Sequence, residues 1–338
     1  MSKLYFHIGW RKAGSSAIQS VLSDPAHRSL FDKYVQPDAG RKAQSNVVGG
    51  APEAHHLLGA VLQTARARRA WRELSAQVST GQESAGDKVL ISSEMFSGHI
   101  ARASEETTKM VADWLAPFDE VVFLAVFRRQ DEFISSMHVQ EAKHGDLGGG
   151  TAQSLTEYFP DANYLATCHK LLALHPKARI EAIEYSSDVL SGFFSRLGID
   201  HMPKAETRQR RLNTRVGPSV YRLQTTLNRA VADDLSLKWL KVMVDRNLHL
   251  LGDLDGAGVV ANPLRIDERK AILEHFWPSN QAFCATFGLD PARFDPARVD
   301  FQSAGAYNIP DRVAPETLEE IKRRLDDRMR RTLDHVAG

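Results

Sequence analysis

Residues 3–22 decide the predicted fold, and their sequence is KLYFHIGWRKAGSSAIQSVL. The β-rich segment 3–8 predicts a short strand that ends at Gly9. Apolar side chains then recur at helical spacing and predict a helix from about Ser15. The side chains on its apolar face are Ala17, Ile18, Val21 and Leu22. A strand, a glycine-containing loop and a helix in this order predict the first half of a βαβ unit.

The alternation of strands and helices continues along the chain. Further strands are predicted at 88–93, 121–127 and 179–184. Further helices are predicted at about 52–78, 104–115, 130–143 and 189–197. The nearly unbroken apolar run 121–127 is typical of a parallel strand that is covered on both faces. The sequence therefore predicts an α/β fold with a mostly parallel sheet.

The C-terminal part of the chain has helical patterns only. They lie at 217–231, 234–246, 267–287 and 315–336. We expect a single domain over residues 1–338, with an α/β cofactor-binding core in 1–200 and a mainly helical portion in 201–338. The helical portion is expected to contribute to an acceptor site or to contacts in a homo-oligomer. The polar loop 36–56 and the glycine-rich segment 145–150 are expected to shape the same acceptor site.

Composition excludes several classes of protein. The chain has 338 residues, of which 43% are hydrophobic, so it has enough apolar material for a folded core. Its 43 Lys and Arg against 42 Asp and Glu leave a net charge of +1, which argues against a nucleic-acid partner. An anion site in this chain must therefore be built locally. The arginines at 66, 68, 69 and 72 predict either a solvated helix face or a surface for an acidic partner.

The cysteines and the apolar runs bear on the compartment. Cys168 and Cys284 are too few for a disulfide framework, and they are interpreted as buried thiols in a reducing compartment. The N-terminus does not resemble a signal peptide. The longest apolar run, 121–127, is far shorter than the roughly 20 residues of a transmembrane helix. We therefore expect a cytoplasmic protein with no transmembrane segment.

Polar and charged residues follow each of the first three predicted strands. The loop Gly9–Ser16 follows the first, Glu94 follows the second, and Arg128 with Arg129 follows the third. In parallel sheets ligands bind beyond the carboxyl ends of the strands. The sequence therefore predicts that this loop, this carboxylate and these guanidinium groups meet at one edge of the sheet.

The loop after the first strand has the chemistry of an anion site. Glycines permit a tight turn, and the N-terminus of the following helix offers N–H groups to an anion. Lys12 adds charge, and the hydroxyls of Ser15 and Ser16 can donate to phosphate or sulfate oxygens. The P-loop pattern is half met, because Gly9 and Gly14 have its spacing but Ser15 stands at its lysine position. That difference, with Glu94 the one acidic candidate for Mg²⁺, disfavours an ATP- or GTP-hydrolysing enzyme.

Three segments resemble the sulfotransferase family. Residues 7–19, HIGWRKAGSSAIQ, are similar to its 5′-phosphosulfate loop. Arg128 and Ser136, eight residues apart, are similar to the pair that holds the 3′-phosphate of the cofactor. Residues 90–94, LISSE, resemble the segment that presents a glutamate base in bacterial and polysaccharide-acting members.

The resemblance implies a function and a set of site residues. The implied fold is a P-loop-NTPase-like parallel sheet flanked by helices, with a mainly helical C-terminal half. The implied reaction transfers the sulfuryl group of 3′-phosphoadenosine 5′-phosphosulfate (PAPS), without a metal, to a hydroxyl or amine of a small-molecule or glycan acceptor, such as a saccharide or glycolipid. Lys12 and Glu94 are the implied catalytic residues, stabilising the leaving phosphate and acting as the base, respectively. The implied cofactor-binding residues are Arg11, Lys12, Ala13, Gly14, Ser15, Ser16, Arg128 and Ser136.

The chain also departs from the family pattern. Ala13 stands where the family has Thr or Ser, and we expect it to offer its backbone N–H to the ligand. Two serines replace the commoner threonine pair. The segment Arg211–Asn213 is either a substitute for the loop that covers the cofactor in the eukaryotic cytosolic branch or a solvated basic turn.

Several residues and the function itself have alternatives. Glu94 is either the base or an ion-pair partner of the nearby cations. His99 and His138 are alternative bases or acceptor contacts, whereas His7 is expected to pack beside the loop and Arg129 is interpreted as structural. Trp10 contacts either a ligand or the core. The alternative functions are a P-loop-type nucleotide kinase or hydrolase, and a non-catalytic nucleotide-binding protein on the same fold.

Overall fold

The fold was analysed in a computed structural model of the whole chain. The residues that it describes are 2–34, 36, 54–55, 58, 64–79, 88–144, 156–186, 188–199, 216–230, 235–256, 259–301 and 307–337. The chain separates into two compact units. The sheet unit comprises Met1–Phe133, Phe159–Leu212 and Leu273–Arg298, and the helical unit comprises Ile134–Tyr158, Asn213–Ile272 and Val299–Gly338. The sheet unit thus includes residues 273–298, which were expected to belong to the helical portion 201–338.

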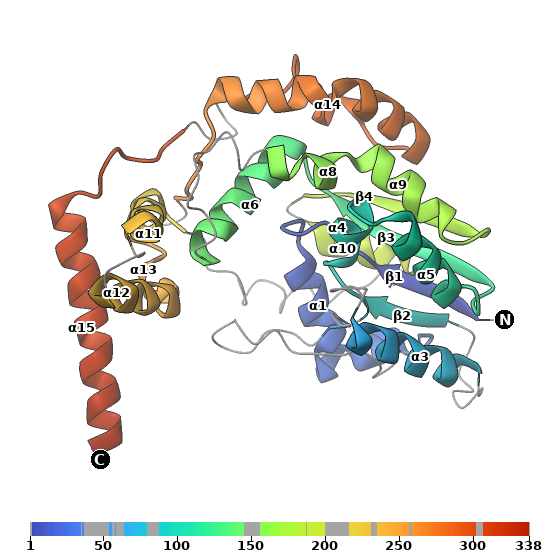
Figure 1. Cartoon of the computed structure of the whole chain (residues 1–338), viewed down its shortest axis with the longest axis horizontal. Coiled ribbons are helices and arrows are strands. Elements are labelled where there is room, and N and C mark those ends of the chain that lie inside the picture. Colours follow the sequence, from blue (N-terminus) through green and yellow to red (C-terminus); the bar gives the residue numbers. More distant parts are fainter. Residues whose placement is uncertain are drawn as a thin grey trace. The chain divides into compact units, whose positions relative to one another are not determined.

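The sheet unit is built on four parallel strands (Figure 1). They are β1 (Lys3–His7), β2 (Lys88–Ser92), β3 (Glu120–Phe127) and β4 (Ala178–Glu184). Their order across the sheet is β2-β1-β3-β4, and Lys3 of β1 lies in register with Lys88 on one side and Glu120 on the other. Because every strand runs the same way, all four carboxyl ends lie at one edge. The predicted fold class, a parallel α/β sheet flanked by helices with a mainly helical C-terminal half, is confirmed.

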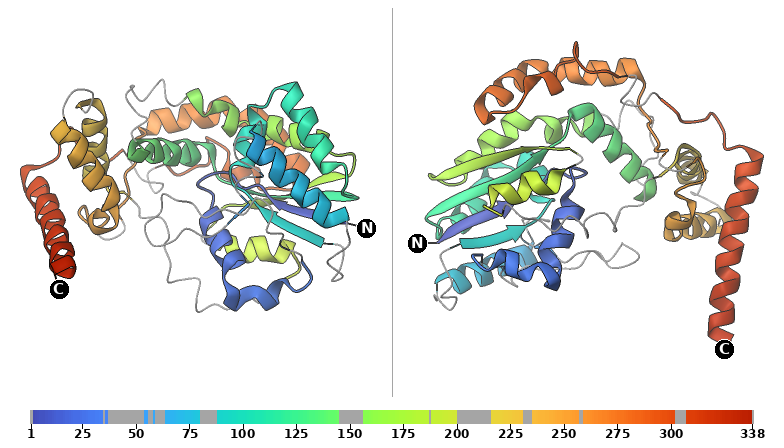
Figure 2. Two further views of the ribbon diagram at one scale, coloured as in Figure 1. Left: turned by 60° about the horizontal axis from the view of Figure 1, so that its bottom comes forward. Right: turned by 180° about the vertical axis from the view of Figure 1, so that it is seen from behind.

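Helices cover both faces of the sheet (Figure 2). One face carries α1 (Ser15–Ser23), the 3-10 helix η1 (Pro25–Phe31) and α10 (Val189–Arg196). The other carries α3 (Ala65–Ser79), α4 (Phe96–Ala101), α5 (Glu105–Leu115), α8 (Phe159–Ala162) and α9 (Tyr164–Ala173). The alternation of β1 side chains explains the two layers. His7 contacts the Phe193 ring of α10, whereas Phe6 contacts Phe96 of α4 on the opposite face.

One predicted helix begins later than expected. The pattern at 52–78 predicted a continuous helix, but α3 begins at Ala65, and Ala54 forms an isolated β-bridge. The reason is the edge strand β2, whose backbone takes partners from this segment. The N–H of His55 donates to the carbonyl of Ser92, at 2.8 Å, and the N–H of Ser92 donates to His55 Nδ1, at 3.1 Å. At residues 54–55 tertiary pairing has overridden the helical pattern, whereas Leu58 is helical and residues 56–57 and 59–63 lie outside the described residues.

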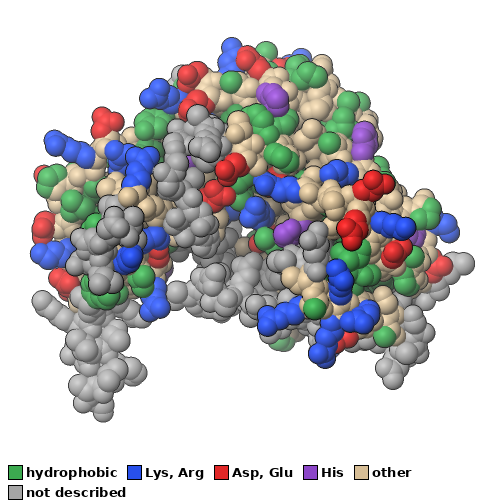
Figure 3. Space-filling model, viewed as in Figure 1, with side chains coloured by type: hydrophobic (Ala, Val, Ile, Leu, Met, Phe, Trp, Pro, Cys, Tyr) green, Lys and Arg blue, Asp and Glu red, His purple; other side chains and the backbone are tan. Residues whose placement is uncertain are grey.

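The arginines of α3 lie on its solvent-facing side. Arg66, Arg68, Arg69 and Arg72 are all exposed, and Figure 3 shows Lys and Arg side chains gathered where α3 lies. Arg69 forms an ion pair with Glu73 one turn on, at 2.7 Å. The opposite side of α3 buries Trp71, which stacks on Trp114 of α5. The helix is therefore amphipathic, and its exposed arginines fit both a solvated face and a surface for an acidic partner.

The helical unit has its own apolar core. It contains α11 (Pro218–Ala230), α12 (Leu235–Arg246), α13 (Leu248–Leu251) and α15 (Pro315–Ala337). Helices α6 (Gln130–His144) and α14 (Ile266–Phe287), with the short η2 (Pro291–Arg293) after the latter, complete the described elements. Both α6 and α14 have residues in each unit. The buried side chains of the core include Val220, Tyr221, Leu227, Val244, Leu251, Ile321 and Leu325.

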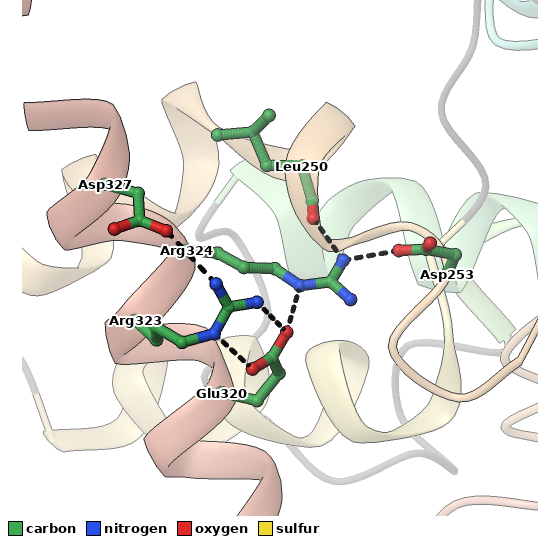
Figure 4. Close-up of polar contacts among 6 residues, drawn as sticks. All are labelled: Leu250, Asp253, Glu320, Arg323, Arg324 and Asp327. Carbon is green, nitrogen blue, oxygen red and sulfur yellow. Dashed lines mark hydrogen bonds and ion pairs between the residues drawn. The ribbon is translucent and has the colours of Figure 1, made fainter. Parts of the chain in front are cut away.

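An ion network joins α15 to the end of α13 (Figure 4). Arg324 donates to Glu320 within the helix, and also to the carbonyl of Leu250 at 2.7 Å and to Asp253 at 2.5 Å. Arg323 contacts only α15 residues in this network, namely Glu320 and Asp327. Arg324 therefore links two elements, whereas Arg323 braces one.

Several sequence predictions concern thiols, membrane segments and loops. Both cysteines are buried and free, as predicted, and burial raises the pKa of Cys284 to about 11. Among the residues that the structure describes, no helix is both long enough and apolar enough to cross a membrane. The segment 145–150, Arg211 and Asn213 lie outside the described residues, as does the loop 36–56 apart from residues 36 and 54–55.

Candidate anion-binding site

The loop between β1 and α1 has an unusual backbone. Gly9, Lys12 and Gly14 all have positive φ, at 46°, 65° and 86°. A side chain on Gly9 would place its Cβ 2.5 Å from Ser15 Oγ, and one on Gly14 would place it 2.9 Å from Val189. Both glycines are therefore required by shape. Lys12 adopts the left-handed conformation despite its side chain, at a cost of about 1–3 kcal/mol.

Buried contacts hold this backbone in place. The N–H of Ala13 donates to the carbonyl of Trp10 at 3.1 Å, and Ser97 Oγ of α4 donates to the carbonyl of Gly9 at 2.6 Å. The Trp10 ring is buried against Phe127, with ring centroids 4.5 Å apart, and its Nε1 donates to the carbonyl of Asp161. Trp10 is thus a core residue that anchors the loop.

The loop delivers the chain to the N-terminus of α1. Gly14 precedes the helix and provides no side-chain cap, and the first turn holds no acidic residue. Ser15, the first residue of the helix, is 2% exposed, and its Oγ has no hydrogen-bond partner among the described residues. An unpaired buried hydroxyl costs about 1–3 kcal/mol. A helix N-terminus with such a hydroxyl suits an anion, because the N–H groups and the hydroxyl can all donate.

Charged side chains gather around the loop. Burial lowers the pKa of Lys12, the Glu94 carboxylate opposes this shift, and Arg128 and Arg11 add to it. These influences show that the three cations and the carboxylate share one neighbourhood, as the order of the strands predicted. An anionic ligand would offset the mutual repulsion of the cations and raise the pKa of Lys12 again.

Arg128 is both a charge at the site and a structural link. Its Nη1 donates to the carbonyl of Lys12 at 3.1 Å, and its Nε donates to Glu132 at 3.0 Å. The guanidinium lies over the Tyr185 ring, 5.0 Å from the centroid, and its own carbonyl accepts from Tyr164 Oη. The first of these contacts holds the strained residue Lys12 from the neighbouring strand.

The remaining predicted cofactor residues have different surroundings. Arg11 lies 3.8 Å from the buried carboxylate of Asp161, which Arg102 also binds through two nitrogens, at 2.9 and 3.1 Å. Ala13 is fully buried. Its N–H was expected to face the ligand, but that expectation is wrong, because the N–H is bonded within the loop to Trp10.

The two remaining predicted cofactor-binding residues, Ser16 and Ser136, are both half-buried serines. Ser16 is half-buried in the first turn of α1. Ser136 is half-buried on α6 and belongs to the helical unit, whereas Arg128 belongs to the sheet unit.

Arg129 and the alternative bases can also be placed. Arg129 is held by Asp131, through two nitrogens at 2.6 and 3.1 Å, which agrees with its structural interpretation. His99 lies on α4, where burial and then Arg11 lower its pKa. His138 is buried in the helical unit near Tyr221, and burial lowers its pKa to about 4.

Sequence reasoning missed a buried polar cluster beneath the loop. His7 Nδ1 lies 2.8 Å from Ser92 Oγ, to which Gln19 Nε2 of α1 donates at 3.3 Å. Gln19 is 2% exposed on the face of α1 that was predicted to be apolar. The one available signal was this polar residue in the middle of an apolar stripe.

No model of a known protein family, no curated protein and no solved structure matches the chain.

Proposed function

We propose that this protein transfers the sulfuryl group of PAPS to a hydroxyl or amine of an acceptor. The observation that carries the proposal is the buried, unpartnered hydroxyl of Ser15 at the uncapped N-terminus of α1. Lys12 and Arg128 supply charge at the same loop, and Glu94 supplies a carboxylate beside them. The resemblance of residues 7–19 to a 5′-phosphosulfate loop makes PAPS the anion that we favour.

The described residues fit such a ligand in part. We assign the 5′-phosphosulfate to Lys12, the amides at the start of α1, and the hydroxyls of Ser15 and Ser16. Arg128, which is half-buried, is assigned to the 3′-phosphate. Ala13 contributes through its small, buried side chain, which permits the close packing of the loop.

The chemistry of the donor defines what the protein must do. When bound, PAPS supplies the sulfuryl group: its bond from sulfur to the bridging oxygen breaks, acceptor oxygen or nitrogen bonds to sulfur, and 3′-phosphoadenosine 5′-phosphate leaves with the electron pair. Lys12 stabilises negative charge on the leaving phosphate, and Glu94 accepts the proton of the acceptor. Catalysis then rests on positioning and on fixed charge. A general base typically contributes about 10²–10⁴-fold.

The acceptor class follows from the resemblance of residues 90–94. We propose a saccharide or glycolipid headgroup, since that segment is similar to the one presenting a glutamate in polysaccharide-acting sulfotransferases. The even charge balance and the two free thiols suit a cytoplasmic enzyme without a nucleic-acid partner.

Ligand binding tests the proposal against its alternatives. Calorimetry and thermal shift should show tight binding of 3′-phosphoadenosine 5′-phosphate and much weaker binding of ATP with Mg²⁺. At a ligand concentration of 100 times Kd, the stabilisation should be about 2.7 kcal/mol. Preference for ATP with Mg²⁺ would instead support a kinase or hydrolase.

Transfer of radiolabelled sulfate tests catalysis. Wild-type protein with labelled PAPS should label at least one member of a panel of saccharides, glycolipids, alcohols, amines and phenols. Tight binding of 3′-phosphoadenosine 5′-phosphate without labelling of any member would support a non-catalytic nucleotide-binding protein.

A further inference from the structure

His7 is the last residue of β1 and stands directly before the loop. Its side chain is fully buried, and the Phe193 ring lies edge-on to it, with centroids 4.9 Å apart. Burial lowers the pKa of His7 to about 3. The imidazole is therefore neutral at ordinary pH, so one ring nitrogen carries a proton and the other accepts.

The neighbours of His7 determine which nitrogen carries the proton. Ser92 Oγ accepts from Gln19 Nε2, because an amide nitrogen can only donate. The hydroxyl proton of Ser92 is satisfied only if it has an acceptor, and leaving it unpaired in this buried cluster would cost free energy. Among the described contacts of this hydroxyl, His7 Nδ1, at 2.8 Å, is the one atom that can accept it. Nδ1 is thus the acceptor, and the proton of the neutral ring is on Nε2.

The Nε2–H of His7 points to the region where the loop leaves β1. Nε2 is buried and has no partner among the described residues. It lies 3.3 Å from the position that a Cβ on Gly9 would take, and Ser15 Oγ lies 2.5 Å from the same position. The Cβ of Glu94 also lies 3.3 Å from it. Two buried, unpartnered donors therefore flank Gly9 beside the N-terminus of α1.

We propose that His7 is a neutral hydrogen-bond donor of the anion site. Its Nε2–H and the hydroxyl of Ser15 donate to an oxygen of the bound anion, and Ser92 with Gln19 fixes the tautomer that makes this possible. Naming the 5′-phosphosulfate as that anion rests on the proposed function, whereas the position of the proton does not. A neutral donor also adds no repulsion to the cations already gathered there.

The first experiment locates the proton. Long-range ¹H–¹⁵N correlation spectra of the full chain should show the His7 ring neutral and protonated on Nε2 from pH 5 to pH 8. Titration with inorganic pyrophosphate should move the Nε2–H proton resonance. A proton on Nδ1, or a His7 resonance that neither pyrophosphate nor 3′-phosphoadenosine 5′-phosphate moves, overturns the inference.

The second experiment separates a donor from a packing residue. His7→Leu should weaken binding of 3′-phosphoadenosine 5′-phosphate by about ten- to a hundredfold, the loss expected for a hydrogen bond to a charged group. His7→Gln, which keeps an N–H donor, should retain most of the affinity. The matched control is His175→Gln, because His175 is another buried histidine of the sheet unit, bonded to the carbonyl of Phe118. The affinity of His175→Gln for 3′-phosphoadenosine 5′-phosphate should equal that of wild type.

Folding and the proposed function are controlled in the same series. Thermal unfolding of each variant controls for loss of the fold. Ser92→Ala leaves His7 in place but removes the hydroxyl that favours one tautomer of its ring. This variant should therefore bind 3′-phosphoadenosine 5′-phosphate more weakly than wild type. Equal affinity of His7→Leu and wild type would overturn the inference. If wild type itself failed to bind 3′-phosphoadenosine 5′-phosphate, the proposed function would fall, and the proton position with the pyrophosphate titration would still decide the role of His7.

Discussion

Lys12 has both a strained backbone conformation and an ammonium group with a lowered pKa. It combines positive φ with an ammonium whose pKa is lowered by burial, and the Arg128 side chain donates to its carbonyl. Strain of this kind persists where the surrounding structure enforces it, often at functional sites. Lys12 is therefore the residue at which the proposed function is most directly tested.

Replacing Lys12 by alanine should abolish sulfuryl transfer while the fold persists. The reason is that positive charge beside the leaving phosphate is lost, and Lys12 is not among the buried residues of the core. Binding of 3′-phosphoadenosine 5′-phosphate to wild type should also weaken as pH rises, because the ammonium loses its proton below its usual pKa of 10.5. Calorimetry between pH 7 and pH 10 should show this decline in wild type and its absence in Lys12→Met. Unchanged turnover in Lys12→Ala would contradict the assignment.

The role of Glu94 can be tested by replacing its carboxylate with an amide of the same shape. Glu94→Gln should preserve the affinity for 3′-phosphoadenosine 5′-phosphate within a few fold and lower kcat by about 10²–10⁴-fold, because an amide cannot accept the acceptor proton. Calorimetry and the labelled-sulfate assay measure the two effects separately. If binding is lost together with rate, Glu94 serves as the ion-pair partner of Lys12.

Arg128 should show two separable effects. Arg128→Ala removes the proposed contact to the 3′-phosphate and also the contact to the Lys12 carbonyl. We therefore expect a small loss of affinity for adenosine 5′-phosphate, caused by the loosened loop, and a much larger loss for 3′-phosphoadenosine 5′-phosphate. Calorimetry with the two ligands measures the difference. Equal losses would leave Arg128 with its structural role alone.

At the scale of elements, the two units use charge in different ways. In the sheet unit the arginines of α3 face solvent, while Arg102 and Arg11 lie beside the buried carboxylate of Asp161. In the helical unit an exposed network links α15 to α13. Hydrogen bonds from Arg323 and Arg324 lower the pKa of Glu320 to about 2. That carboxylate stays charged, and the network intact, until strongly acidic pH.

The paired arginines of α15 provide a matched test of this link. Arg324→Met should increase amide hydrogen exchange in the N-terminal half of α15 and around α13, because the contacts to Leu250 and Asp253 are lost. Arg323→Met, which loses contacts within α15 only, should leave exchange around α13 unchanged. High salt should reduce the difference between wild type and Arg324→Met, since exposed charges are screened. Identical exchange in the two variants would show that the link contributes nothing.

At the scale of the whole molecule, each unit carries a buried neutral histidine. His7 lies in the sheet unit with its pKa lowered to about 3, and His138 lies in the helical unit with its pKa lowered to about 4. Both values are below the ordinary 6.5, so the unfolded chain takes up protons at acidic pH that the folded chain does not. Stability is therefore full above pH 6.5 and falls as the pH drops toward 4 and then 3.

The free energy of unfolding should fall by about 2 kcal/mol per histidine between pH 6.5 and pH 5. Denaturant unfolding at a series of pH values measures this slope. His138→Gln should flatten the slope in the helical unit, and His7→Gln should do so in the sheet unit, as followed by hydrogen exchange in each unit. A slope that neither change reduces would assign the acid sensitivity to other groups.

Much of the fold and part of the site were predictable from sequence, because local patterns carry them. Strand and helix periodicity predicted β1 to β4, α5 and α10 to within about two residues. Parallel connection then predicted that Lys12, Glu94 and Arg128 would meet at one sheet edge, and the pKa influences on Lys12 agree. Among the described residues of the predicted helix 52–78, periodicity failed at 54–55, where the chain pairs with the edge strand β2.

Three-dimensional contacts decided the rest. The concentration of positive charge at one sheet edge was readable from sequence, since residue types and their positions after each strand are local facts. That the Ala13 N–H is bonded within the loop, and that Trp10 anchors it, follows from contacts that form only in the folded chain. The proposed donor role of His7 also depends on tertiary contacts, because Ser92 lies 85 positions from His7 along the chain and Gln19 lies 73 positions from Ser92. Hydrogen-bond direction is set by partners that only folding brings together.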